Sequence, residues 1–350
     1  MMSFTDMNKG RPGVWFNFAP VVEQAIEGSD GAVAIVKKDY NTTATADTAY
    51  EFTTLTEAKE IIGTSKMDDI RRAFKGGASK VVVYTLKAPE GLEKEYDYTG
   101  AQTALSLRFF EGVTFDHPLT AAAVTSWKDW ATTQAKEERY LPVFYGVDDD
   151  TDTAAGIARA VADKSELVAT AINAPVFGDV TWKSWEAANW IAGKFASTPL
   201  SQSLTYAEVE GATDVSVRLT NPQIVEALSK GAMVFEYNGR KVRLVRGVTT
   251  AGTSLKNLAF KQAFTRDIKF YLEEVFIGKV PNGPNQRLSA EGSIKSQYMQ
   301  TYEDREVIDS DWSLKVLPGP GKRQVVVEVV AVDLETMEEF YITVSQGGGN

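Results

Sequence analysis

The fold is decided by one stretch, which reads Leu141-Pro-Val-Phe-Tyr-Gly146, then Thr153-Ala-Ala-Gly-Ile-Ala-Arg-Ala-Val-Ala-Asp163, then Glu166-Leu-Val-Ala-Thr-Ala-Ile172. The first and third pieces are short apolar runs, which is typical of strands that are buried on both faces. The Ala-rich middle piece predicts a helix. A strand, helix and strand in this order predict two parallel strands, so we expect a parallel sheet with helices on its faces.

The same alternation extends toward the N-terminus. Helices are expected at residues 119–138 and 182–194, a strand at 113–115 and another strand at 101–110. Further upstream, apolar strands at 31–36, 50–54 and 80–86 enclose helices at 56–62 and 68–74, where Gly76-Gly77 suits a helix stop. These elements predict a small α/β domain that the polar connection at 88–97 separates from the next one.

The C-terminal part mixes helices with hairpins. Asn221 is expected to cap a helix at 221–228, and Asn238-Gly239 predicts a tight hairpin. A long helix is expected at 255–276 with Gln262 on its polar side, and a shorter one at 289–302. The turn Leu317-Pro-Gly-Pro-Gly-Lys322 joins two strand patterns, at 312–316 and 324–332. An α+β domain follows from this pattern.

Both ends of the chain carry strand patterns that have no local partner. We expect these two arms to complete sheets that include other copies of the chain, because exposed strand edges are normally suppressed unless pairing is their purpose. The residues assigned to this contact are Val14, Trp15, Phe16 and Phe18 in the N-terminal arm, and Phe340, Tyr341, Ile342 and Val344 in the C-terminal arm.

The predicted fold class is therefore α/β and α+β. Its middle domain is a parallel sheet with flanking helices, and strand exchange between subunits completes its C-terminal domain. The predicted divisions are an N-terminal arm at 1–20, a small α/β domain at 21–98, an α/β domain at 99–235, a C-terminal domain at 236–338 and a C-terminal arm at 339–350.

Composition narrows the possible functions. The formal net charge of −10 argues against wholesale nucleic-acid binding, which needs clustered Lys and Arg. The absence of cysteine excludes disulfides, thiolate metal sites and Cys nucleophiles. No apolar run is long enough for a signal peptide or a membrane span, so we expect a protein without membrane insertion.

Few residues nominate an enzyme site. His117, the single histidine, lies in a turn-like break and is interpreted as a loop residue. Asp148, Asp149, Asp150 and Asp152 are the most metal-like group, but their spacing fails for a calcium loop and suits a solvated loop that caps the next helix. The sequence has no phosphate loop and no nucleophile elbow. No catalytic, metal or cofactor site is therefore predicted.

Two further groups have a structural and a functional interpretation. Trp182, Trp185 and Trp190 have near-helical spacing and indicate core packing more than a stacking platform. Positive charge gathers at 241–269 of an otherwise acidic chain. It belongs either to a solvated helix face or to a contact with an acidic partner.

The stretch from Ser201 to Val344 closely resembles contractile phage tail sheath proteins. The resemblance is carried by Ser201-Gln-Ser-Leu-Thr-Tyr206, Arg218-Leu-Thr-Asn-Pro222, Gly247-Val-Thr-Thr250, Tyr271-Leu-Glu-Glu-Val-Phe-Ile-Gly-Lys-Val-Pro-Asn282 and the Val-rich end at 325–344. Residues 31–86 and 185–193 also look like parts of that family, so the resemblance covers nearly the whole chain.

The resemblance implies a structural subunit of a phage tail or of a phage-tail-like bacteriocin. Such subunits form stacked hexameric rings around an inner tube, join a baseplate and a tail terminator, and contract to drive the tube through a cell envelope. The subunit would be assembled in the host cytoplasm and would reside in the particle's tail. Our candidates for facing the tube are Lys256, Lys261, Arg266 and Lys269.

Two departures from the family pattern stand out. The chain lacks the β-sandwich that such sheaths often insert after the first α/β part, and the family's Asn is replaced around Val248, which leaves the hydrogen bonding of that turn open. The family's middle domain is sometimes called subtilisin-like, which describes a fold and not a catalytic triad. The competing classes are an α/β enzyme with a metal or an anionic small molecule at the Asp148–Asp152 loop, and an inner tube subunit.

Overall fold

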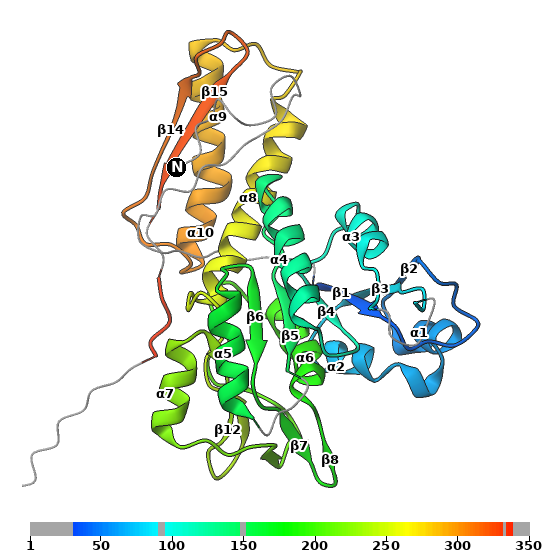
Figure 1. The fold of residues 1–350 in the computed structure, drawn as a ribbon. Coiled ribbons are helices and arrows are strands. Elements are labelled where there is room, and N and C mark those ends of the chain that lie inside the picture. The colour runs from blue at the N-terminus through cyan, green and yellow to red at the C-terminus, as the bar shows by residue number, and fades with distance from the viewer. Residues whose placement is uncertain (1–30, 90–94, 148–151, 332–333, 339–350) are drawn as a thin grey trace, which may run out of the picture.

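The computed structural model describes residues 31–89, 95–147, 152–331 and 334–338. Its centre is a seven-stranded sheet with the order β11-β6-β5-β4-β1-β3-β2 (Figure 1). Every neighbouring pair in this sheet is parallel except β2 with β3. The strands are β1 Ala32–Lys37, β2 Thr48–Phe52, β3 Lys80–Thr85, β4 Gly112–Phe115, β5 Val143–Gly146, β6 Val168–Ala171 and β11 Ala232–Met233. The predicted parallel sheet is confirmed.

Helices cover both faces of this sheet. Helices α1 Leu55–Ile62 and α2 Asp68–Gly76 connect β2 to β3, and α2 packs against α6 Ser184–Ser197, which lies across β4, β5 and β1. The helices α3 Thr99–Ser106, α4 Ala121–Lys136 and α5 Thr153–Asp163 connect β3, β4, β5 and β6 in turn. Right-handed crossovers place these three on the opposite face. The strands buried between the helices explain the continuous apolar runs in the sequence.

The sheet continues across the predicted boundary between the first two domains. β1 pairs with β3 on one side and with β4 on the other, so strands from 21–98 and from 99–235 share one sheet. One apolar core also runs through both segments. The domain division stays a prediction.

Residues 101–110 are helical at their start, so the predicted strand there is wrong. α3 ends at Ser106. Ala101 and Leu105 are four residues apart and both are fully buried against the sheet, whereas Leu107 and Phe109 are exposed. Helical spacing of the two buried residues therefore decides the conformation.

Smaller antiparallel sheets and short helices complete the lower part of the molecule. One sheet contains β7 Pro175–Phe177, β8 Val180–Thr181 and β10 Asp214–Val215, and the other contains β9 Ala207–Glu208, β12 Phe235–Tyr237 and β13 Val242–Leu244. The hairpin at Asn238-Gly239 is confirmed, with β12 and β13 antiparallel. Helix α7 Asn221–Ser229 is capped by Thr220 instead of the predicted Asn221, because the side chain of Gln223 reaches back to Thr220.

Helix α8 Leu255–Val275 carries the chain out of the sheet domain (Figure 1). Its first turns pack into the main core, while Phe264 and Ile268 belong to a second core. Gln262, expected on the polar side, is buried and donates to the carbonyl of Glu111 at 3.0 Å. The helix is covered on more than one face there because it passes between two cores.

The second core lies between α8, a bent helix and a β-hairpin. The bent helix consists of α9 Pro284–Ile294, a π-helical turn Lys295–Met299 and α10 Gln300–Asp304, so it begins earlier than the predicted residue 289. The hairpin is β14 Ser313–Pro318 and β15 Val325–Val330. Its prediction from the Pro-Gly-Pro-Gly turn is confirmed. No helix in the described ranges is long and apolar enough to cross a membrane.

Candidate functional site

The arm residues predicted to join subunits lie outside the described ranges. They are Val14, Trp15, Phe16, Phe18, Phe340, Tyr341, Ile342 and Val344. Their pairing therefore stays a prediction. The structure does describe the surfaces that could receive such strands and the residues to which the C-terminal arm is attached.

The β14–β15 hairpin is the smallest sheet in the described part of the chain. It has two strands, and neither pairs with a third one among the described residues. Leu314 and Val316 point into the second core, whereas Val325 and Val330 are each nearly half exposed. A two-stranded sheet is marginal alone and gains stability from further strands. Both outer edges of the hairpin are thus unpaired within the described part of the chain.

Polar contacts hold this hairpin in place. The carboxylate of Glu291 on α9 accepts the backbone N–H of Val316 at one oxygen (3.0 Å) and the ammonium of Lys295 at the other (2.7 Å). The side chain of Asn282 donates to the carbonyls of Lys322 and Gln324 at 3.1 and 3.0 Å. These contacts fix the hairpin against helix and loop, so its strands keep their orientation.

The four predicted tube-facing cations occupy different environments. Lys256 is buried and its ammonium donates to the carbonyl of Leu334. Lys261 pairs with Glu166 at 3.0 Å, and Arg266 pairs with Glu111 at 2.9 Å. Lys269 is half-buried, and the described residues show no ion pair for it. Contact with a tube remains a prediction for all four.

A charged cluster lies at the carboxyl ends of β1 and β4, where chain connections diverge and α/β proteins often bind ligands. The ammonium of Lys37 contacts Asp69 at 2.9 Å and Asp116 at 3.4 Å. His117 lies 2.7 Å from Asp116 and 2.8 Å from the hydroxyl of Tyr98. His117 follows β4 as predicted for a loop, but it is buried.

The cluster's electrostatics are those of an internal ion network. Burial alone would lower the pKa of Lys37, but the two carboxylates outweigh it and raise that pKa. Burial raises the pKa of Asp69, while hydrogen bonds and the charges of His117 and Lys37 overcome burial and lower the pKa of Asp116. The side chains of Lys37, Asp69, Asp116 and His117 form a connected network and are nearly inaccessible to solvent. This cluster therefore stabilises the carboxyl end of the sheet.

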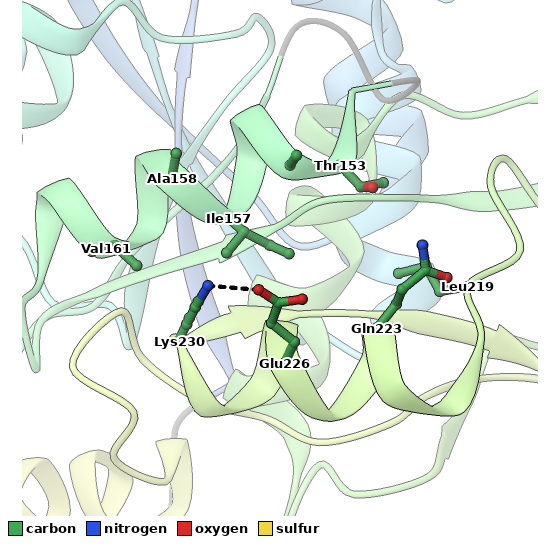
Figure 2. Close-up of a pocket in the computed structure, with 9 residues that line it drawn as sticks. Thr153, Ile157, Ala158, Val161, Leu219, Gln223, Glu226 and Lys230 are labelled. Atoms are coloured by element: carbon green, nitrogen blue, oxygen red, sulfur yellow. Dashed lines mark hydrogen bonds and ion pairs between the residues drawn. The ribbon is translucent and has the colours of Figure 1, made fainter.

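An open groove of about 440 Å³ lies between α5 and α7 (Figure 2). Its wall on α5 is mainly apolar, and the Glu226–Lys230 pair at 2.6 Å stands on the α7 side. The lining residues are Thr153, Ala154, Ile157, Ala158, Val161, Leu219, Gln223, Glu226 and Lys230. They provide an apolar contact surface, and they include no catalytic constellation.

The acidic loop is only partly described. Asp152 accepts the backbone N–H of Ala155 at 2.9 Å and caps α5, as predicted for a helix-capping loop, whereas Asp148, Asp149 and Asp150 lie outside the described residues. Within the described ranges, no group of three or more His, Cys, Asp or Glu side chains could hold a metal ion. Of the three tryptophans, Trp182 and Trp190 are buried, as core packing predicts.

The turn around Val248 uses threonines for its hydrogen bonds. The Thr249 and Thr253 hydroxyls lie 2.7 Å apart, and the Thr249 N–H donates to the Thr253 carbonyl at 2.9 Å. The Thr250 hydroxyl accepts the N–H of Ser165 at 2.9 Å. These hydrogen bonds answer the question that the replaced Asn raised about this turn: threonine side chains and backbone groups hold it.

Comparison with known proteins identifies the central part of the chain. Residues 94–250 match a family model described as the phage tail sheath protein central domain. The chain is 27% identical over 179 residues to protein XkdK of the phage-like element PBSX of Bacillus subtilis, a match that covers 45% of this chain and 38% of that protein. It is 22% identical over 255 residues to the tail sheath protein of Clostridium phage phiCD119, covering 70% of this chain and 68% of that one. The chain thus spans under two fifths of the first relative.

Solved structures share the fold over a larger part of the chain. The sheath tail protein from Desulfitobacterium hafniense matches with a TM-score of 0.67 and 14% identity, over 92% of this chain and 100% of that one. The contracted helical sheath of the anti-feeding prophage matches with a TM-score of 0.68 and 14% identity, over 97% and 100%. At these identities the likeness establishes a shared fold. Together with the central-domain match it confirms the resemblance drawn from the sequence.

Proposed function

We propose that the chain is the structural subunit of a contractile tail sheath, because its residues 94–250 match the central domain of the phage tail sheath family. The central-domain match carries this proposal. The subunit polymerises as stacked hexameric rings around an inner tube, and contraction of the rings drives the tube through a bacterial envelope. Its partners are further copies of itself, the tube, the baseplate and the tail terminator, and it resides in the particle's tail. Its role is mechanical and not catalytic.

The arms are proposed to join neighbouring subunits by strand exchange. The β14–β15 hairpin supports this because both of its strands lack a third partner in the described part of the chain. Added strands would bring backbone hydrogen bonds and cover the half-exposed Val325 and Val330. Ladders of this kind persist while subunits rotate as rigid bodies, so rings could rearrange without losing their connections.

The tube contact is proposed to involve α8. Lys269 is the best of the four candidates, because Lys256, Lys261 and Arg266 already contact groups within the chain. Weak, solvent-accessible charge pairs would suit a contact that has to release during contraction.

Electron microscopy of the purified protein tests the proposal. We expect hollow cylinders or rings that grow more abundant as protein concentration rises. Sedimentation of the same samples would measure the assembled fraction. A protein that stays strictly monomeric at high concentration and forms no rings when mixed with its tube protein would overturn the proposal.

A further inference from the structure

The segment 334–338 returns from the upper hairpin to the sheet domain before the C-terminal arm begins (Figure 1). It makes no strand ladder, and its contacts are mostly polar. The N–H of Leu334 donates to the carbonyl of Val307 at 3.4 Å, and the carbonyl of Leu334 accepts the ammonium of Lys256. The hydroxyl of Thr336 contacts that of Ser203 at 3.1 Å.

Glu338, at the end of this segment, attaches it to the sheet domain through several polar contacts. Its carboxylate pairs with the guanidinium of Arg246 at 2.6 Å. It also accepts hydrogen bonds from the hydroxyls of Thr205 at 2.6 Å and Ser203 at 3.3 Å. We call these four residues, Ser203, Thr205, Arg246 and Glu338, the clasp. The side chain of Glu338 is 15% exposed and that of Arg246 is 48% exposed, so the pair is half open to solvent on the arginine side.

Apolar burial contributes little to holding the segment. Met337, which precedes Glu338, is 85% exposed, and Leu334 is exposed as well. The clasp therefore determines where residue 338 sits. The partners of Glu338 are Ser203 and Thr205, in the loop before β9, and Arg246, which follows β13. Both places belong to the sheet domain and not to the hairpin.

We propose that the clasp is the anchor that fixes the point from which residues 339–350 leave the subunit, and so sets which neighbouring subunit they reach. This rests on the proposed sheath function. The twelve residues of the arm span at most about 40 Å when extended. Opening the clasp would free residues 335–338 as additional slack, while Leu334 would stay bound to Val307 and Lys256. The arm would then search a larger volume, and its effective concentration at the neighbour's sheet would fall.

Charge reversal tests the clasp in the full-length protein. Arg246→Glu places a second carboxylate beside Glu338, and the double variant Arg246→Glu with Glu338→Arg restores opposite charges. Arg240→Glu is the matched control because Arg240 is exposed and makes no ion pair among the described residues. Cleavage after the exposed Glu335 by a glutamate-specific protease reports on the clasp in unassembled protein, and sedimentation gives the concentration needed for assembly.

We expect Arg246→Glu to speed cleavage after Glu335 and to raise the concentration needed for assembly, each by about tenfold, which corresponds to loss of one well-placed charge pair. The double variant should recover most of both effects, and Arg240→Glu should show neither. Faster cleavage with unchanged assembly would overturn the anchoring role, and unchanged cleavage would overturn the clasp itself. Failure of the unaltered protein to assemble would count instead against the sheath function.

Discussion

Single residues explain why the charged cluster beside β1 and β4 is structural. Lys37 is held between Asp69 and Asp116, and each carboxylate would be costly to bury alone. One carboxylate oxygen of Asp69 has no hydrogen-bond partner among the described residues, which agrees with the raised pKa of that group. An active site at the end of a parallel sheet needs access for a ligand, and these side chains leave almost none. The network instead ties β1, β4 and α2 together.

Gly193 shows how closely two helices can depend on one missing side chain. A Cβ at this position in α6 would lie 2.1 Å from the carbonyl oxygen of Ala73 in α2. Gly193→Ala should therefore destabilise the fold by about 3 kcal/mol, because the helix pair would have to separate. Urea unfolding of the variant measures this loss.

Gly292→Ala provides the matched control. Gly292 lies in α9, and a Cβ there would meet no atom within 4 Å. The same substitution should stabilise the protein there by about 0.5–1 kcal/mol, through helix propensity alone. Equal effects at both positions would contradict the close-packing explanation.

At the scale of elements, the hairpin β14–β15 depends on a carboxylate. The hydrogen bond from Lys295 and that from the N–H of Val316 lower the pKa of Glu291 below its ordinary value. A lowered pKa means that the contact stabilises the fold above the unfolded pKa of about 4.3 and is lost as pH falls through the folded value. We expect the hairpin to loosen from α9 in that acid range while it stays docked near pH 7.

Fluorescence of Trp312, which donates to Glu303 at 2.6 Å just before β14, can follow this change. Glu291→Gln should weaken docking at pH 7 and reduce the difference between pH 7 and the acid range. Glu273→Gln removes an exposed carboxylate of α8, and its fluorescence should depend on pH in the same way as that of the unaltered protein. An identical acid profile in the Glu291 variant would show that another group controls docking.

Most helices and strands could be predicted from the local sequence, because burial and turn geometry leave recognisable patterns of apolar and turn-forming residues. The buried strands at β1, β3, β5 and β6 show as apolar runs, and the turns at Asn238-Gly239 and Pro318–Gly321 can form only a few backbone shapes. The strand predicted at 101–110 failed because Leu105, Leu107 and Phe109 alternate, while the packing of Ala101 with Leu105 decides for a helix. Tertiary contact overrode local preference there.

The clasp could not have been predicted from pattern. Ser203 and Glu338 are 135 residues apart and Thr205 and Glu338 are 133 apart, and isolated polar residues have no periodicity that reveals a partner. All four clasp residues lie in the stretch 201–344 that resembles sheath proteins. That resemblance was the only signal in the sequence, and it did not name Glu338.

On the scale of the whole molecule, α8 connects two bodies with different tasks. The sheet domain has a continuous core that buries its strands, whereas the hairpin beside the smaller core pairs with no third strand among the described residues. The clasp brings the chain back from the second body to the first before the arm departs. In our proposal the arm starts from a point held on the sheet domain, and its destination is the hairpin of another subunit.

This arrangement predicts that assembly depends on strand pairing by the arms and not merely on their apolar character. Proline lacks the N–H that a ladder requires, so Phe16→Pro in the N-terminal arm or Ile342→Pro in the C-terminal arm should abolish sheaths seen by electron microscopy. Phe16→Ala and Ile342→Ala keep the N–H and should retain rings with weaker assembly. Deletion of residues 1–18 should leave a folded protein that no longer polymerises, because the strand pattern at 14–18 is expected to pair with another subunit. If the proline variants assemble as well as the alanine variants, strand exchange is not what joins the subunits, and contacts between the folded bodies must carry the assembly.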